Sequence, residues 1–297
     1  MTREREGLLL CLVSAAGFGA MPIFAKQAYA EGLAITPLLA LRFAIAAAML
    51  WALIAVRRRS LGSLRGLAAG AALGLFGYYV QAGLYFGALK RIDAGLASLL
   101  LYAYPALVTV GAIALRRESP SRRRLGALGL ASGGVALVLI GGGPGEIDLA
   151  GAAMALGSAA FYTFFILASD RVAAVTPPLP FAASVATGAG ITFAVAALLE
   201  GGISATGEAV MWTALIASVS TVMPIVLFMA GLVRVGPSTA SIASTIEPPF
   251  TVALAWIVFG ETLRPLQLAG GALVLSAVVL LQLRRSADRV DPVAALA

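Results

Sequence analysis

The sequence predicts an all-helical membrane protein with ten transmembrane helices, arranged as two inverted five-helix repeats around a central cavity. Apolar residues make up 60% of the 297 residues, and only 12% are charged, whereas a soluble domain carries about 25% charged residues. The mean hydropathy is +0.96. Ten predominantly apolar stretches are long enough to cross a bilayer, and a single offset in residue number aligns the two halves of the chain.

The ten predicted spans follow one another with short connections, so neighbouring helices must run antiparallel. A helix rises about 1.5 Å per residue, and about 20 residues therefore cross a hydrocarbon core of about 30 Å. The first apolar stretch is too long for a signal peptide and lacks a clear cleavage site, so we interpret it as the first span. In chain order the spans cover roughly 7–29, 35–56, 66–89, 92–115, 125–142, 149–170, 179–200, 208–232, 236–259 and 265–283.

The distribution of lysine and arginine predicts the orientation of these spans, because cytoplasmic connections carry an excess of both. With the N-terminus inside, the outer face keeps only Lys26, Lys90, Arg91 and Arg264. Both termini are therefore predicted to be cytoplasmic. The inner face collects Arg3, Arg5, Arg57, Arg58, Arg59, Arg65, Arg116, Arg117, Arg122, Arg123, Arg124, Arg171, Arg234, Arg284, Arg285 and Arg289.

The chain repeats itself at an offset of 144 residues. For example, Gly7 in the first half aligns with Gly151 in the second. Each unit holds five spans, an odd number, so the second copy enters the membrane from the opposite side. Such inverted repeats are typical of secondary transporters. We expect a first repeat at 1–145, a second at 146–285 and a cytoplasmic tail at 286–297. Further aligned pairs are Ser14 and Ser158, Gly87 and Gly231, Lys90 and Arg234, Pro105 and Pro249, Val108 and Val252, and Gly126 and Gly270.

Composition also excludes several classes of function. The chain has no histidine and one cysteine, Cys11, which excludes a disulfide framework and a Cys/His metal site. We expect no metal and no cofactor. The basic residues form no stripe with interleaved aromatic residues, so nucleic acid is not an expected partner. An enzyme is not expected either, because intramembrane chemistry needs a histidine base or clustered acids. The expected partners are a small-molecule substrate and the lipid bilayer, with no obligate protein partner evident.

Polar side chains on four spans form the candidate substrate site. A hydroxyl or amide without a partner costs several kcal/mol in lipid, so these faces should point inward. One interpretation is a cavity wall in which tyrosine rings stack on a substrate, and the alternative is hydrogen bonding between helices. The candidates are Tyr78, Gln81 and Tyr85 on the third span, Ser98 and Tyr102 on the fourth, Ser158 and Tyr162 on the sixth, and Glu247 on the ninth.

Prolines within the spans are predicted to kink the helices, because each removes a backbone hydrogen bond. Inside a bilayer the freed carbonyl groups must meet protein or water, so the kinks should border the cavity and act as hinges. The predicted hinge residues are Pro22, Pro105, Pro224, Pro248 and Pro249.

Charged residues inside the spans have several possible roles. Glu247 lies eleven residues into its predicted span, roughly 16 Å along the helix, and could bind a substrate ammonium, titrate as a proton-coupling group or fix the packing of the kinked helix. Arg42 could extend to the outer interface, pair with a polar neighbour or bind a substrate carboxylate. Lys26 and Asp170 occupy equivalent positions at opposite faces, as solvated helix-end charges or gate elements.

Four motifs resemble the EamA-type domain of the drug/metabolite transporter superfamily: Arg42-Phe43, Tyr102-Ala103-Tyr104-Pro105, Ile246-Glu247-Pro248, and Phe259-Gly260-Glu261-Thr262-Leu263. The resemblance implies a bacterial inner-membrane exporter whose cavity is lined by spans 1, 3, 4, 6, 8 and 9. Tyrosine-rich members are similar to exporters of aromatic and other amino acids. The first span lacks the glutamate of the small four-helix multidrug members, which argues against proton-for-drug antiport.

The function hypothesis is therefore a secondary transporter that exports small amphipathic metabolites, foremost amino acids including aromatic and hydrophobic ones, by alternating access. The alternatives are a transporter of another metabolite, such as a sugar phosphate, a nucleotide sugar or a drug, and an intramembrane enzyme. A cavity poor in lysine and arginine would hold a phosphate group badly.

Overall fold

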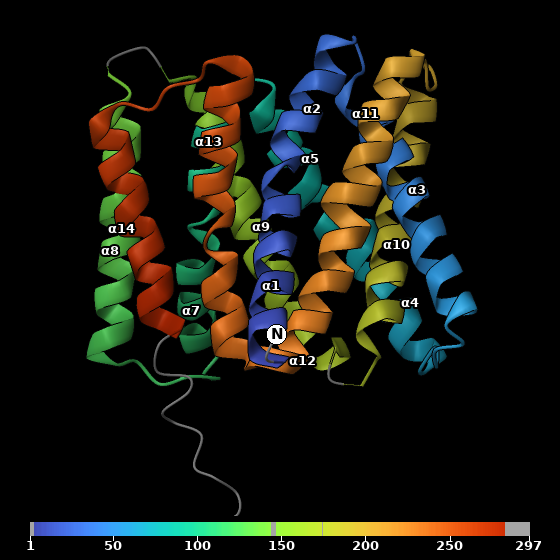
Figure 1. Cartoon of the computed structure of the whole chain (residues 1–297), viewed down its shortest axis with the longest axis horizontal. Coiled ribbons are helices and arrows are strands. Elements are labelled where there is room, and N and C mark those ends of the chain that lie inside the picture. The colour runs from blue at the N-terminus through green and yellow to red at the C-terminus, as the bar shows by residue number, and fades with distance from the viewer. Residues whose placement is uncertain (1–2, 144–146, 174, 283–297) are drawn as a thin grey trace, which may run out of the picture.

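The computed structural model describes residues 3–143, 147–173 and 175–282, which form a bundle of helices (Figure 1). The expected boundary between the repeats at 145 and 146 and the expected tail 286–297 lie outside the described residues. The helices are α1 (Arg3–Gly19), α2 (Met21–Ala30), α3 (Ile35–Val56), α4 (Leu64–Leu73), the π-helical turn η1 (Gly74–Tyr78), α5 (Tyr79–Leu89), α6 (Ala94–Leu101), α7 (Tyr104–Ala114), α8 (Arg122–Gly141), α9 (Leu149–Ala173), α10 (Pro178–Leu199), α11 (Gly207–Ala217), the π-helical turn η2 (Ser218–Val222), α12 (Met223–Ser244), α13 (Glu247–Phe259) and α14 (Pro265–Gln282).

The ten predicted spans are confirmed, since the described part of the chain contains ten helical segments that are long and apolar enough to cross a membrane. The chain is thus a multi-pass membrane protein. Span 1 combines α1 and α2, span 3 combines α4, η1 and α5, and span 4 combines α6 and α7. Span 8 ends at Pro237 within α12, and span 9 continues from Thr239 through α13. The remaining spans are α3, α8, α9, α10 and α14.

The duplication is visible in the backbone as well as in the sequence. The π-helical turns η1 and η2 begin at residues 74 and 218 and end at residues 78 and 222, so they lie 144 positions apart. Two pairs of residues with positive φ, all beyond helix ends, follow the same spacing. Arg58 (φ 48°) matches Gly202 (φ 94°), and Arg116 (φ 56°) matches Gly260 (φ 69°). The two halves therefore share local conformation even where their residue types differ.

Spans 5 and 10 form one edge of the bundle, where α8 packs along α14 (Figure 1). The two helices approach at Gly134 and Gly270. A Cβ atom on either glycine would lie 2.6 Å from the carbonyl oxygen of the other, which is too close for any side chain. Glycine thus permits backbone contact between these helices, as is common within membranes.

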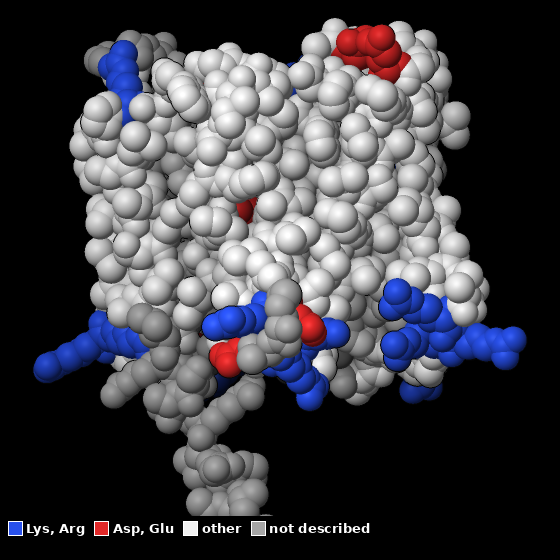
Figure 2. Space-filling model, viewed as in Figure 1, with Lys and Arg blue, Asp and Glu red and all other residues white. Residues whose placement is uncertain are grey.

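Charged residues gather at the two ends of the bundle and are sparse between them. Figure 2 shows basic side chains along the end at which the N-terminus lies, here called the N-terminal face. The opposite end is called the distal face. At the distal face the Gly151 N–H and the Arg91 guanidinium, which lies 2.9 Å from the carboxylate, hold the pKa of Asp148 below its ordinary value.

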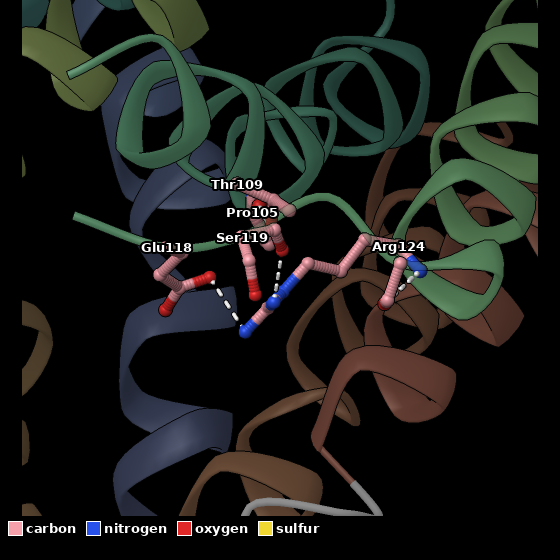
Figure 3. Close-up of polar contacts among 6 residues, drawn as sticks. Pro105, Thr109, Glu118, Ser119 and Arg124 are labelled. Atoms are coloured by element: carbon pink, nitrogen blue, oxygen red, sulfur yellow. Dashed lines mark hydrogen bonds and ion pairs between the residues drawn. The ribbon is translucent and has the colours of Figure 1, made fainter. Parts of the chain in front are cut away.

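Polar contacts also order the connection between α7 and α8 at the N-terminal face. Arg124 pairs with Glu118 at 3.0 Å and donates a hydrogen bond to the Ser119 carbonyl (Figure 3). Ser121 caps α8 by accepting the Arg124 N–H at 3.3 Å, a role that suits a serine at a helix start. The connection after span 4 is therefore held by its own side chains.

Candidate functional site

Helix breaks near the middle of spans 1, 4 and 9 build the site. The prolines predicted as hinges mark these breaks: Pro22, Pro105 and Pro248 each fall in the first turn of the helix that follows. In a first turn the missing N–H costs no helical hydrogen bond. Pro249 follows in the same turn, and Pro224 lies in the first turn of α12, which follows η2. Whether these positions move as hinges stays a prediction. No proline lies in η1, which is why the sequence did not predict that turn.

Side chains from other spans satisfy the carbonyl groups that the breaks set free. The Tyr102 hydroxyl donates to the Ser244 carbonyl oxygen at 2.8 Å, at the end of α12. Thr251 Oγ1 donates to the Gly19 carbonyl oxygen at 2.8 Å, at the end of α1. In hydrocarbon such groups must be satisfied by protein. The breaks are therefore tied to one another by side chains of the other half of the chain.

A cavity of about 560 Å³ lies between the broken spans. Spans 2 and 7 also contribute to its wall, through residues such as Phe43 and Val185. The predicted set of lining spans was therefore incomplete, because α3 and α10 pack against each other beside the π-helical turns. The lining residues are Phe18, Met21, Arg42, Phe43, Leu50, Tyr78, Gln81, Ala82, Tyr85, Phe86, Leu101, Tyr102, Tyr104, Tyr162, Phe165, Pro178, Phe181, Ala182, Val185, Ala186, Thr221, Ile225, Phe228, Met229, Ser244 and Glu247.

Glu247 brings a carboxylate to this cavity at the first residue of α13. Its Oε2 accepts a hydrogen bond from the Tyr102 hydroxyl at 3.0 Å. Among the described residues no cation forms an ion pair with Glu247. The carboxylate is held in place but its charge is not neutralised by the protein.

Arg42 brings the opposite charge, and its side chain is only 2% exposed. Its Nε donates to Thr221 Oγ1 at 3.3 Å, and its guanidinium carbon lies 4.7 Å from the Phe43 ring centre and 5.1 Å from that of Phe86. Arg42 therefore does not extend to the membrane interface, which corrects that alternative. Within the described part of the chain it has no carboxylate partner. The position of Arg42 along its predicted span could not show that its side chain points into the bundle.

Aromatic rings form a continuous wall between these two charged groups. The Tyr104 ring lies 4.8 Å from Tyr162, which stacks on Phe165 at 6.2 Å. Phe165 meets Tyr78 at 5.2 Å, and Tyr78 meets Phe43 at 5.7 Å. Rings in such geometries present both apolar faces and polar hydroxyl groups to a ligand. The cavity can therefore hold an amphipathic molecule.

The structure divides the predicted binding residues into two groups. Tyr78, Gln81, Tyr85, Tyr102, Tyr162 and Glu247 line the cavity. Ser98 and Ser158 are buried outside this lining, and substrate binding by any of the eight residues stays a prediction. Ser158 Oγ donates to the Gln81 carbonyl oxygen and accepts from Gln81 Nε2, both at 3.0 Å. Helix spacing placed Ser158 on a polar face, but that face meets span 3.

Other lining residues were missed by the sequence analysis. Tyr104 is the clearest case, since its ring lies 5.8 Å from that of Tyr102. Residues two apart in an unbroken helix point to different sides, so the motif spacing argued against both rings facing one cavity. The break between α6 and α7 at Tyr102 and Ala103 removes that constraint. A proline directly after Tyr104 was the available signal.

Comparison with known proteins assigns the chain to a class. A sequence model described as the EamA-like transporter family matches residues 5–140 and 149–283. The threonine/homoserine exporter RhtA of Escherichia coli strain K12 is 33% identical over 151 residues, which is 48% of this chain and 48% of that protein. The match to this exporter thus spans about half the length of either protein.

Two further matches cover most of the chain. The transporter YcbK of Bacillus subtilis strain 168, named as uncharacterized, is 27% identical over 281 residues, which is 89% of this chain and 88% of that protein. A protein known from its crystal structure matches with a TM-score of 0.66 and 17% identity, covering 96% of this chain and 99% of that one. At this identity the structural likeness shows a shared fold.

Proposed function

The chain belongs to the EamA-like transporter family, and from that premise we propose that it is a secondary transporter that exports amino acids by alternating access. One observation carries the substrate class: Arg42 and Glu247, of opposite charge, line the same buried cavity. A cation and an anion in one enclosed space match the two charged groups of a zwitterion. The α-ammonium would bind Glu247 and the α-carboxylate would bind Arg42.

The energetics of burial support this proposal. A charge removed from water is costly unless it is paired. An amino acid carries a counter-charge for each of these groups, and guanidinium and carboxylate match in bidentate geometry. The Tyr102 hydroxyl holds Glu247 at 3.0 Å and Thr221 holds Arg42 at 3.3 Å. Both charged groups are thereby positioned before the substrate arrives.

The cavity wall supports amino acids with compact or aromatic side chains. A volume of about 560 Å³ lies within the range of about 300–1,000 Å³ that is usual for small-molecule sites. The half-length similarity to a threonine/homoserine exporter extends the proposed range from aromatic and hydrophobic amino acids to small hydroxylated ones. Phosphorylated substrates fit less well. Arg42 is the single basic residue in the described lining, whereas a phosphate group carries more negative charge than a carboxylate and would need more basic partners.

We also propose the bacterial inner membrane as the location, with the N-terminal face in the cytoplasm. The clusters of arginine at that face support this orientation through the positive-inside rule (Figure 2).

Competition in proteoliposomes tests the proposal. Uptake of labelled threonine would be challenged with each of the twenty amino acids, with N-acetylthreonine, which lacks the ammonium group, and with threonine amide, which lacks the carboxylate. We expect free amino acids to compete and both blocked analogues to lose at least about tenfold in apparent affinity, as the loss of a charged hydrogen bond implies. Equal competition by the blocked analogues, or exchange of a sugar phosphate instead, would contradict the proposal.

A further inference from the structure

Two ion pairs at opposite faces of the bundle occupy equivalent positions in the two repeats but have reversed polarity. At the distal face Lys26 Nζ lies 2.5 Å from Glu261 Oε1, and at the N-terminal face Arg117 Nη1 lies 3.7 Å from Asp170 Oδ2. Residues 26 and 170 are 144 positions apart, as are 117 and 261. The first pair has its cation on span 1, whereas the second has its anion on the corresponding span 6.

The backbone around the two pairs confirms that they are counterparts. Glu261 follows Gly260, which ends α13 at φ 69°, and Arg117 follows Arg116 at φ 56° just beyond α7. In each repeat a left-handed residue closes the helix and turns the next side chain across the face of the bundle. The same local geometry therefore presents an anion at one face and a cation at the other.

The distal pair is the tighter of the two. Its Lys26 and Glu261 side chains are 19% and 11% exposed, and Glu261 Oε2 also accepts the Ala94 N–H at 2.7 Å, at the start of α6. Because a helix N-terminus favours an anion, Glu261 joins spans 1, 4 and 9 at this face. Such a partly buried pair is costly to break from one side.

The pair at the N-terminal face is looser. Its Arg117 and Asp170 side chains are 31% and 74% exposed, and Arg117 makes its other hydrogen bond at 2.9 Å to the Leu167 carbonyl oxygen, on the same helix as Asp170. An exposed ion pair contributes little. The contact therefore joins only spans 4 and 6, and weakly.

The cavity extends toward the N-terminal face. Its lining reaches Pro178, the first residue of α10 at the N-terminal face, and includes Leu50 in the half of α3 nearer that face. None of the four residues of the two ion pairs lines it. Because the tight pair joins three spans at the distal face and the lining reaches Pro178 at the other, we interpret the conformation as closed at the distal face.

We propose that the two ion pairs are alternating latches of the transport cycle. Lys26–Glu261 holds the distal face closed in the conformation described here, and Arg117–Asp170 tightens to hold the N-terminal face closed in the opposite conformation. This inference rests on the alternating access of the proposed function. The helix N-terminus at Ala94 adds to the distal latch alone, so the resting protein favours the distal-closed state.

Cysteine accessibility tests the latches. Ala186, a lining residue near the middle of α10, would be replaced by cysteine in a Cys11→Ala background and labelled with an impermeant maleimide from the distal face, in vesicles of known sidedness. Glu261→Gln should raise the labelling rate about fivefold or more, a typical size for conformational coupling. Arg117→Gln should lower it. Asp148→Asn, which breaks the exposed distal pair with Arg91, is the matched control and should leave the rate unchanged.

The outcomes test the latch proposal separately from the proposed substrate. A rate in Glu261→Gln equal to that of the parent, or a change in the same direction in Glu261→Gln and Arg117→Gln, overturns the proposal. Lys26→Met breaks the same distal pair while keeping the Glu261 bond to Ala94, and it replaces Glu261→Gln should that variant fail to fold. Labelling needs no substrate, so failure of amino-acid transport in proteoliposomes would leave this measurement interpretable.

Discussion

The hydroxyl group of Tyr102 lies 3.0 Å from the carboxylate of Glu247, and each residue stands at the break of its own span, one in each half of the chain. The same hydroxyl reaches the Ser244 carbonyl oxygen, which the break in span 9 has freed. The single hydroxyl proton of this side chain in the first repeat is thus shared between the Ser244 carbonyl oxygen and the Glu247 carboxylate of the second repeat.

Replacement of Glu247 by glutamine should reduce export and flatten its dependence on pH. Glutamine keeps the size and hydrogen-bonding capacity of the side chain but can neither carry a negative charge nor take up a proton. Flux in proteoliposomes between about pH 5.5 and 8 measures the effect, with the exposed Glu200→Gln as control. Unchanged flux with an unchanged pH profile would leave Glu247 a structural residue.

Tyr102→Phe should lower transport while the protein stays folded. The variant keeps the ring in the wall but removes the donor to Glu247 and Ser244, a loss of about 1–3 kcal/mol for a hydrogen bond to a charged group. We expect a rise in the apparent KM for the amino acid of roughly tenfold. Tyr29→Phe is the matched control, because Tyr29 lies outside the cavity lining and its hydroxyl bonds only the backbone carbonyl oxygen of Phe86. Equal effects of both variants would argue against a specific role of Tyr102.

Arg42→Gln should abolish the preference for a free carboxylate. The variant keeps a polar side chain for Thr221 but loses the guanidinium, so threonine and threonine amide should compete about equally. Arg42→Lys keeps the charge without the planar fork and should retain part of the preference. If Arg42→Gln still discriminates between the two compounds, the carboxylate binds elsewhere.

Gln81→Ala and Tyr78→Ala should have different effects. The Gln81 side chain donates one hydrogen bond to Ser158 across spans 3 and 6, and such a bond contributes about 0.6 kcal/mol on average in membranes. Its removal should lower the thermal stability in detergent. Tyr78 contacts Phe43 and Phe165 with its ring and should chiefly affect flux per folded molecule. Two variants with the same loss of stability and normal residual flux would make both residues structural.

Lys26 and Asp170 should be labelled from opposite sides of the membrane. Each would be replaced by cysteine in a Cys11→Ala background and exposed to an impermeant thiol reagent in intact cells. The inverted repeat predicts reaction of Lys26→Cys in intact cells and reaction of Asp170→Cys only after the membrane is opened. Labelling of both from the same side would contradict the inverted topology.

The sequence by itself determined that the protein lies in a membrane, how many times it crosses it, and that the chain is duplicated. Hydrocarbon requires about 20 consecutive apolar residues per crossing, so composition and length were sufficient to predict ten spans. The offset of 144 predicted that the halves share a fold, and the π-helical turns at Gly74–Tyr78 and Ser218–Val222 follow it. These properties depend on local composition or on the comparison of the chain with itself.

Only the tertiary structure decided which polar groups meet. Spacing along an unbroken helix could not show that Tyr102 and Tyr104 face one cavity, because the break between α6 and α7 changes their directions. Nor could it show that Ser158 faces Gln81, or that Arg42 is buried against aromatic rings. The pairing of Lys26 with Glu261 joins residues 235 positions apart. Such contacts depend on how the two repeats pack. Hydrophobic periodicity predicts which face of a helix is buried, but not which residue a polar side chain on that face contacts.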